Sequence, residues 1–166
     1  MARTSTTSRA PRPPRDARPE DRERVAELFA ASERLHATLH PVYFRAEGRL
    51  DQRLVEAIEA PSDERALFVV ERDRRVMGFV HVELLEPRAR SRARLGRRGH
   101  IDALVVDPAA RRSGCGRALV DAAAAWVRER GALELLLTVW AGNREAERFY
   151  EHLGLVSVSR VMKLSL

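Results

Sequence analysis

Residues 111–117, R-R-S-G-C-G-R, have the composition of an anion-binding loop. They follow the apolar stretch I-D-A-L-V-V and precede an alanine-rich run with helical periodicity. The first N–H groups of a helix have no partner within it, and the helix dipole adds partial positive charge there. Gly114 and Gly116 let a backbone approach a ligand closely, and the flanking arginines add charge. The loop therefore predicts phosphate binding, although a plain glycine turn into a helix fits it equally well.

The loop lacks residues that two common nucleotide-binding motifs require. A nucleoside triphosphate loop needs a lysine and a hydroxyl after its last glycine, and neither is present. A dinucleotide loop needs a third glycine where Leu119 stands, and the next apolar stretch does not end on an acidic residue.

Metal and thiol chemistry are disfavoured as well. Cys115 is the only cysteine, so the chain has neither a disulfide nor a cysteine pair for zinc. His36 and His40 are four residues apart, a spacing that suits a metal, but no glutamate follows His36 and no third ligand is near. We expect no metal site, and we expect Cys115 to be a small apolar plug beneath the loop, with a reactive thiol as the second alternative.

The composition is that of one soluble domain. The chain has 166 residues, of which 45% are hydrophobic and 33% charged. It has no apolar run of the ~20 residues that a membrane span needs, and its N-terminus lacks the apolar core of a secretion signal, so we expect a cytoplasmic protein. The net charge of +6 would suit nucleic acid, but acidic residues are interspersed and aromatics are only 5%. A basic nucleic-acid-binding domain is therefore the least favoured hypothesis.

The pattern along the chain predicts which elements position the loop. Residues 1–13 are rich in Pro, Arg, Ser and Thr and predict a disordered tail, with the domain covering 14–166. Helical periodicity and helix stops predict helices over 21–39, 52–60, 116–130 and 143–153. Apolar and β-branched runs predict a hairpin of strands 66–71 and 76–85, an arginine-rich loop over 87–98, and strands over 100–106, 133–140 and 156–166. This order indicates an α/β fold with a sheet of mixed direction.

Two motifs together resemble the GNAT superfamily of N-acyltransferases. The first is R-x-x-G-x-G, formed by Arg111, Gly114 and Gly116 after an apolar strand. The second is N-x-x-A-x-x-F-Y-x-x-x-G, which begins at Asn143 and includes Tyr150. The similarity is tight from about residue 98 to the end and looser from about residue 15. It implies a single-domain, mostly antiparallel sheet with a central splayed parallel strand pair, flanked by about four helices.

The resemblance implies acetyl-CoA as cosubstrate. The loop amides would hold its pyrophosphate, and the main chain of the preceding strand would pair with the pantetheine arm where that strand parts from strand 133–140. Asn143 would also contact the arm, or would cap its helix, and the two roles are compatible. The implied cofactor-binding residues are Leu104, Val105, Val106, Arg111, Arg112, Ser113, Gly114, Cys115, Gly116, Arg117, Asn143 and Tyr150.

The implied reaction is direct attack of a primary amine on acetyl-CoA in a ternary complex. An alkyl ammonium has a pKa near ~10, so it must lose a proton before it can attack. Asp102 and His100 occupy the places where the family often carries a base, and a strand would put both on the same face as Leu104 and Val106. A salt bridge with an arginine is an equal alternative for Asp102, and a structural role is the alternative for His100. Tyr150 would protonate the departing thiolate, or would be a core tyrosine.

The acceptor side is less defined. His36, His40, Tyr43 and Phe44 fall where the family's first helices wall the acceptor pocket, and Glu83 on the hairpin is a further candidate. A non-catalytic acyl-CoA-binding sensor or interaction module on the same fold is the alternative to an enzyme. Family members are often dimeric, so a homodimer is possible.

Overall fold

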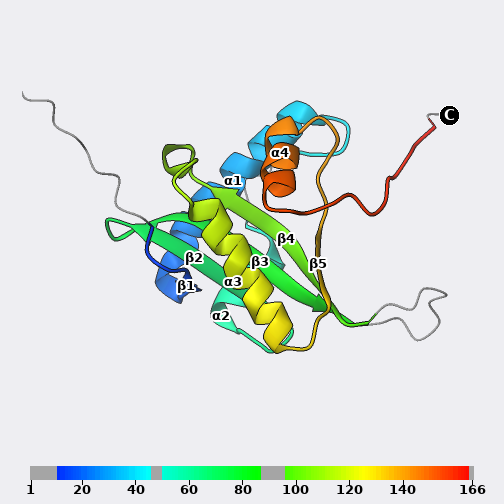
Figure 1. The fold of residues 1–166 in the computed structure, drawn as a ribbon. Coiled ribbons are helices and arrows are strands. Elements are labelled where there is room, and N and C mark those ends of the chain that lie inside the picture. The colour runs from blue at the N-terminus through cyan, green and yellow to red at the C-terminus, as the bar shows by residue number, and fades with distance from the viewer. Residues whose placement is uncertain (1–10, 46–49, 87–95, 165–166) are drawn as a thin grey trace, which may run out of the picture.

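A computed structural model describes residues 11–45, 50–86 and 96–164 as one α/β domain (Figure 1). Two short 3-10 turns, η1 (Pro19–Asp21) and η2 (Pro108–Ala110), precede α1 and α3. The strands are β1 (Arg15–Asp16), β2 (Arg65–Arg72), β3 (Arg75–Leu85), β4 (Arg98–Val106) and β5 (Glu134–Leu137). The helices are α1 (Arg22–Leu39), α2 (Gln52–Glu59), α3 (Cys115–Glu129) and α4 (Arg144–His152). None of these helices is both long and apolar enough to cross a bilayer.

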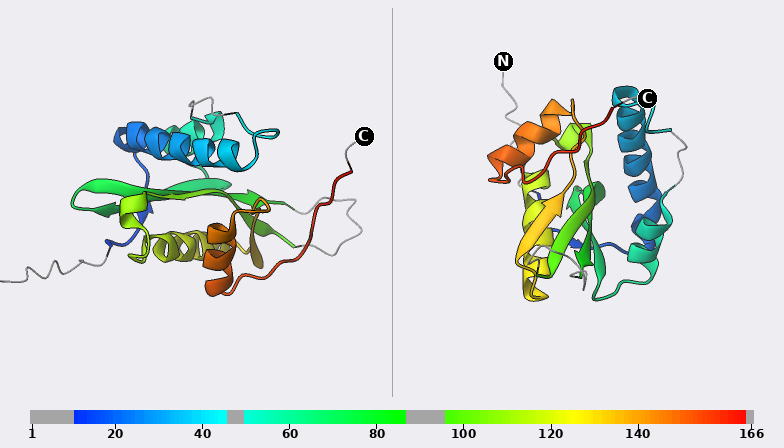
Figure 2. Two further views of the ribbon diagram at one scale, coloured as in Figure 1. Left: turned by 90° about the horizontal axis from the view of Figure 1, so that it is seen from above. Right: turned by 90° about the vertical axis from the view of Figure 1, so that its right-hand side faces the viewer.

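The five strands form one sheet in the order β1-β2-β3-β4-β5, antiparallel except for the parallel pair β4 and β5. Helices α1 and α2 cover one face, and α3 and α4 lie on the other (Figure 2). Each face has its own apolar cluster, centred on Phe79 and Leu54 on the α1/α2 side and on Val80 and Leu119 on the α3 side. The predicted mixed sheet with a parallel strand pair and four helices is confirmed, but among the described residues this pair lies at the edge of the sheet rather than in its centre.

Three elements of the structure and the prediction do not agree. The two-residue strand β1 was not predicted, because it is too short to show a period of two. The strand β5 covers four residues rather than eight. No strand forms over residues 156–164, where a last strand was expected, and residues 165–166 lie outside the described range.

The C-terminal segment, residues 156–164, is extended but has no strand partner in the described part of the chain. Figure 1 shows it leaving α4 at the edge of the molecule. Its large apolar side chains are between 76% and 96% exposed: Val156, Val158, Val161, Met162 and Leu164. Strand-forming residues without a partner explain why the local pattern and the structure disagree. Most of the predicted tail (1–10) and most of the arginine-rich loop (87–95) lie outside the described residues.

Arg15 ties the start of the domain to the sheet. Its guanidinium donates to both oxygens of Asp21, at 2.7 and 2.9 Å, and its Nε donates to Glu71 of β2 at 3.0 Å. Asp21 is only 6% exposed and also accepts from the Arg18 amide at 2.8 Å. Burial opposes ionisation of Asp21, but the bonds from Arg15 and Arg18 outweigh it and leave the pKa of this carboxyl below its ordinary value.

We expect Asp21→Asn to lower the free energy of unfolding by about 2 kcal/mol, because Arg15 loses a buried charged partner. A lowered carboxyl pKa stabilises the fold above the unfolded value near ~4, and this stabilisation disappears as the pH falls through the folded value. The difference in free energy of unfolding between the wild type and Asp21→Asn should therefore be present at pH 7 and become smaller below about pH 4. Urea unfolding at several pH values measures it.

Glu20→Gln is the matched control, since Glu20 lies next to Asp21 but makes only a 3.8 Å exposed pair with Arg18. It should change stability by less than about 0.5 kcal/mol. Equal stability of Asp21→Asn and Glu20→Gln at pH 7 would contradict the account.

Candidate functional site

The parallel strands β4 and β5 separate part-way along the sheet. They pair from Arg98↔Glu134 to Ile101↔Leu137, and β4 then continues to Val106 without β5. On its other edge β4 stays paired with β3 as far as Gly78↔Val106. Among the described residues, the main chain of β4 beyond Ile101 therefore has no strand partner on the β5 side. Unpaired N–H and C=O groups at such an opening can pair with an extended ligand.

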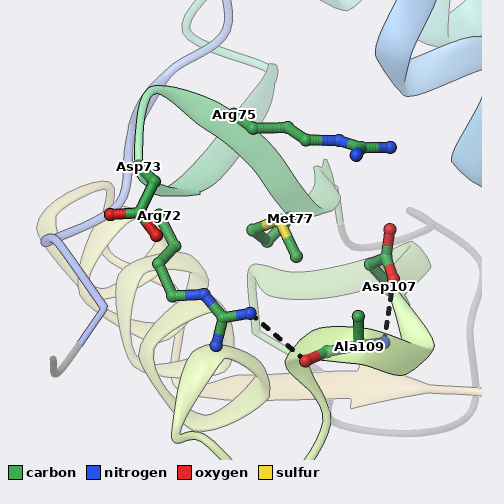
Figure 3. Close-up of a pocket in the computed structure, with 6 residues that line it drawn as sticks. All are labelled: Arg72, Asp73, Arg75, Met77, Asp107 and Ala109. Carbon is green, nitrogen blue, oxygen red and sulfur yellow. Dashed lines mark hydrogen bonds between the residues drawn. The ribbon is translucent and has the colours of Figure 1, made fainter. Parts of the chain in front are cut away.

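The turn after β4 is held by three side-chain contacts. Asp107 accepts from the Ala109 amide at 2.8 Å and pairs with Arg24 of α1. From the end of β2, Arg72 donates to the Ala109 carbonyl at 3.3 Å. Arg72, Asp107 and Ala109 border a pocket that Met77 also lines (Figure 3). The pocket does not include the glycine loop. The contacts around it fix the position at which the loop begins.

The loop itself presents free amides on an open side. Gly114 is the N-cap of α3, with a φ of 89° and no side-chain cap, and Arg112 also has a positive φ, 58°. The Ala118 amide donates to the Gly114 carbonyl at 3.0 Å, so the three amides from Cys115 to Arg117 precede the helical bonds. A β-carbon on Gly114 would meet only Pro11, at 4.0 Å. The geometry is thus that of an anion cradle open to solvent.

The remaining loop residues support this backbone. Cys115 is 1% exposed and lies in the core beneath the loop, where its sulfur is 3.1 Å from the Ser113 hydroxyl. Ser113 donates to the Ala110 carbonyl at 2.6 Å. Arg111 pairs with Glu145 of α4 at 2.9 and 3.2 Å, whereas the side chains of two further arginines, Arg112 and Arg117, are exposed.

Helix α4 packs directly against the loop. A β-carbon on Gly116 would lie 2.9 Å from the Phe149 ring, so this glycine is needed for the contact with α4. Asn143 caps α4 by accepting from the Ala146 amide at 3.2 Å. Tyr150 packs against the core, and burial raises the pKa of its hydroxyl to about 12.

Asp102 occupies a β-bulge at the point where β4 and β5 separate. The register with β3 passes from His81↔Ala103 to Val82↔Ile101, which leaves Asp102 without a partner. The prediction that His100, Asp102, Leu104 and Val106 share one face is therefore wrong. Leu104 and Val106 pack on the α3 side, while Asp102 contacts Arg53 of α2 on the opposite face. The extra residue shifts the alternation by one.

The bulge brings Asp102 into a charged cluster with Glu83. Between them lies His81, which is fully buried and 3.6 Å from each carboxylate. The pKa of Asp102 is lowered by His81, raised by burial and lowered further by Arg53, and the net shift is downward. His100 pairs in register with Glu83 and lies close to Asp102. The sequence patterns did not lead us to predict His81 as a site residue. The signal that could have identified it is a histidine within the apolar run V-M-G-F-V-H-V.

Four of the five residues expected on the acceptor side come together as an aromatic cluster, whereas Glu83 lies apart on β3 beside His81. His36, His40, Tyr43 and Phe44 lie at the end of α1 and just after it, and Trp140 follows β5. The Trp140 ring centroid is 5.4 Å from His40, 5.2 Å from Tyr43 and 4.9 Å from Phe44. Trp140 was not predicted, because its contact with α1 spans about a hundred residues. Within the described ranges, no three His, Cys, Asp or Glu residues gather as a metal site.

Comparison with known proteins identifies the fold. A variant of the BH1408 protein from Bacillus halodurans is 24% identical with a TM-score of 0.85, covering 92% of this chain and 98% of that one. A transcriptional regulator from Bacillus halodurans C-125 is 25% identical with a TM-score of 0.69, over 92% and 98%. The aminoglycoside N-acetyltransferase AAC(6')-Iy, in complex with CoA, is 18% identical with a TM-score of 0.67, over 95% and 97%.

No curated protein matches the sequence. The family model described as acetyltransferase (GNAT) family matches residues 24–155, which include the separated strands, the glycine loop and α4. The chain therefore belongs to the GNAT acetyltransferase family.

Proposed function

We propose that this protein transfers an acetyl group from acetyl-CoA to a primary amine by direct attack in a ternary complex. One observation carries the proposal: the opening between β4 and β5 leads to a glycine loop with free helix-start amides. An extended arm that ends in a pyrophosphate matches this arrangement, because the arm can pair with strand main chain and the pyrophosphate with the amides.

In this proposal the loop amides from Arg112 to Arg117 bind the pyrophosphate. Arg112 and Arg117 supply the nearby positive charge, since Arg111 is engaged by Glu145. The pantetheine arm pairs with the main chain of β4 at Leu104–Val106. An N–H there polarises the thioester carbonyl and stabilises the oxyanion that forms when the amine attacks. Asn143 can cap α4 and contact the arm at once.

Asp102 is the proposed residue that receives the acceptor amine. It lies at the opening, and its lowered pKa keeps it ionised at neutral pH, so that it attracts an ammonium. His100 lies beside it as a second polar group. The ammonium must give up two protons to become an amide nitrogen, one before the attack and one after it, and the departing thiolate must gain one. The Tyr150 hydroxyl is the proposed donor to the thiolate. A tyrosine is protonated at neutral pH, and burial raises the pKa of this one further.

The proposed acceptor class is a cationic primary amine. Aromatic rings attract ammonium groups through their faces, and the cluster of His36, His40, Tyr43, Phe44 and Trp140 offers several such faces. The ammonium of Lys163, the only lysine of the chain, lies 5.0 Å from the Tyr43 ring and illustrates this preference. Glu83 and Asp102 add negative charge. Aminoglycosides, on which several neighbours act by their titles, fall within this class.

Two measurements test the proposal. Calorimetry with acetyl-CoA should give binding, and thiol release should appear with at least one member of a panel of amino acids, polyamines, aminoglycosides and peptides. Absence of binding at millimolar acetyl-CoA would refute the proposal. Binding without thiol release from any amine would instead support the alternative of an acyl-CoA sensor.

Gly114→Val should weaken acetyl-CoA binding by about 100-fold or more, because a branched side chain would enter the cradle and disturb amides worth about 1.5–3 kcal/mol each toward an anion. Gly131→Val is the matched control. Gly131 also has a positive φ, 77°, and open space around it, but it lies at the far end of α3. The control should suffer similar backbone strain and keep its affinity. Wild-type affinity in Gly114→Val would refute the placement of the pyrophosphate.

Tyr150→Phe should lower kcat by about 100-fold, the scale of losing one general acid. The Kd for acetyl-CoA should stay within about twofold, because the ring that packs in the core is retained. Steady-state kinetics and calorimetry on the same preparation separate the two effects. An unchanged kcat would assign Tyr150 to packing alone.

The C-terminal segment, residues 156–164, supports a homodimer as the proposed assembly. Five large apolar side chains at 76% or more exposure are costly in water, and β5 is one of the two edge strands of the sheet that the described residues form. We infer that the segment of one copy pairs with the other copy. Val158→Asp combined with Val161→Asp should convert a dimer to a monomer by light scattering, while Ser159→Asp in the same segment should not. A monomeric wild type at tens of micromolar would contradict this inference.

A further inference from the structure

His81 is the most constrained polar side chain in the described structure. It is 0% exposed in the middle of β3, yet neither ring nitrogen has a hydrogen-bond partner. Nε2 lies 3.6 Å from Oε1 of Glu83, and Nδ1 lies 3.6 Å from Oδ2 of Asp102. These separations exceed the 2.7–3.2 Å of an ordinary N–H···O bond. A buried imidazole held between two carboxylates without a bond to either requires an explanation.

The charged surroundings of His81 come from three elements. Strand β3 contributes Glu83, and β4 contributes Asp102 with His100 nearby. Helix α2 contributes Arg53, whose guanidinium is 3.4 Å from Asp102 and 3.5 Å from Asp51 at the helix start. On β2 the residue opposite His81 is the apolar Leu67. The imidazole therefore lies directly beside two negative charges, Glu83 and Asp102. The one positive charge, Arg53, contacts Asp102 and not the imidazole.

A neutral His81 has one proton too few to bond to both carboxylates. A neutral imidazole has one N–H and one lone pair. The N–H can serve one carboxylate, but the lone pair then faces the other carboxylate, and two acceptors cannot bond. One additional proton, shared between that nitrogen and its carboxylate, would satisfy both sides. The cluster of Asp102, His81 and Glu83 thus has a place for one proton.

We propose that Asp102, His81 and Glu83 form a relay that takes up the proton lost by the acceptor ammonium, with His81 as the positioning residue between the two carboxylates. This inference rests on the proposed acetyl transfer. The N–H bond of the ammonium breaks, and its proton passes to an Asp102 oxygen and is shared through the imidazole with Glu83. The freed amine electron pair attacks the thioester carbon, and the C–S bond then breaks with its electron pair leaving on the thiolate. The thiolate takes the Tyr150 proton, and the second proton, lost by the nitrogen as the amide forms, restores the Tyr150 hydroxyl through solvent.

The positive and hydrogen-bonding groups around Asp102 explain why it needs the relay. Its pKa lies below the ordinary carboxyl value, so a proton left on Asp102 alone would be held weakly. The imidazole lies between two carboxylates, so a proton shared there is close to both negative charges. The side chains of Asp102 and Glu83 are 25% and 23% exposed, so the relay can later release the proton to solvent.

The first test needs no acceptor and so is independent of the proposed function. Long-range nitrogen NMR of the free protein should show the His81 ring change from one protonated nitrogen to two as the pH is lowered. Glu83→Gln, at the half-buried end of the cluster, should shift that transition by at least about one pH unit, because it removes one of the two carboxylates. A His81 ring whose state stays constant between pH 5 and 9, or a transition that ignores Glu83→Gln, would overturn the relay.

The second test is kinetic. His81→Gln keeps the volume and one donor but cannot take up a proton, so kcat should fall about 10-fold or more and the acid limb of its pH profile should flatten. KM and Kd for acetyl-CoA should be unchanged. His152→Gln, at the exposed end of α4, is the control and should leave both the rate and the profile as in the wild type.

The outcomes separate the two claims. Unchanged kcat and pH profile in His81→Gln would overturn the relay while leaving acetyl transfer intact. If His81→Gln does not fold, the NMR titration with Glu83→Gln decides the matter. If no amine is acetylated by the wild type, the proposed function fails, and the titration still shows whether the cluster takes up a proton.

Discussion

The separation of β4 from β5 is the constraint on which the rest of the site depends. Parallel strands normally satisfy their main-chain groups along their whole length, but here the pairing ends at Ile101 and Leu137. The α3 side stays closed because the loop and α4 pack there through Gly116 and Phe149. This contact fixes the loop and α4 beside the opening, which is the preorganisation that an extended cosubstrate needs.

The bulge at Asp102 links this opening to the acid–base groups. Because the bulge resets the alternation of β4, its apolar residues Leu104 and Val106 face α3, and the carboxylate faces α1 and α2. The proposed cosubstrate and the proposed acceptor thus approach one strand from different sides. The aromatic cluster around Trp140 lies beyond the end of β5. The short strand β5 therefore helps to shape both the proposed cosubstrate site and the proposed acceptor site.

Local features were predictable from the sequence and long-range ones were not. The glycine loop, the Asn143 cap and the helices depend on neighbouring residues, so their patterns predicted them. The bulge at Asp102 depends on register with β3, and a period of two could not show it. His81 resembled a core residue because its partners are distant in sequence. The segment 156–164 has strand composition, but composition cannot supply a partner strand.

The central claim is that acetyl-CoA lies in the opening between β4 and β5 with its pyrophosphate on the loop. Backbone amide NMR during a titration with acetyl-CoA tests it most directly. The account predicts the largest shifts at the amides of residues 104–106 and 112–117, with little change in β1 and β2. Saturable shifts confined to other surfaces, such as the pocket of Figure 3 around Arg75, would contradict it.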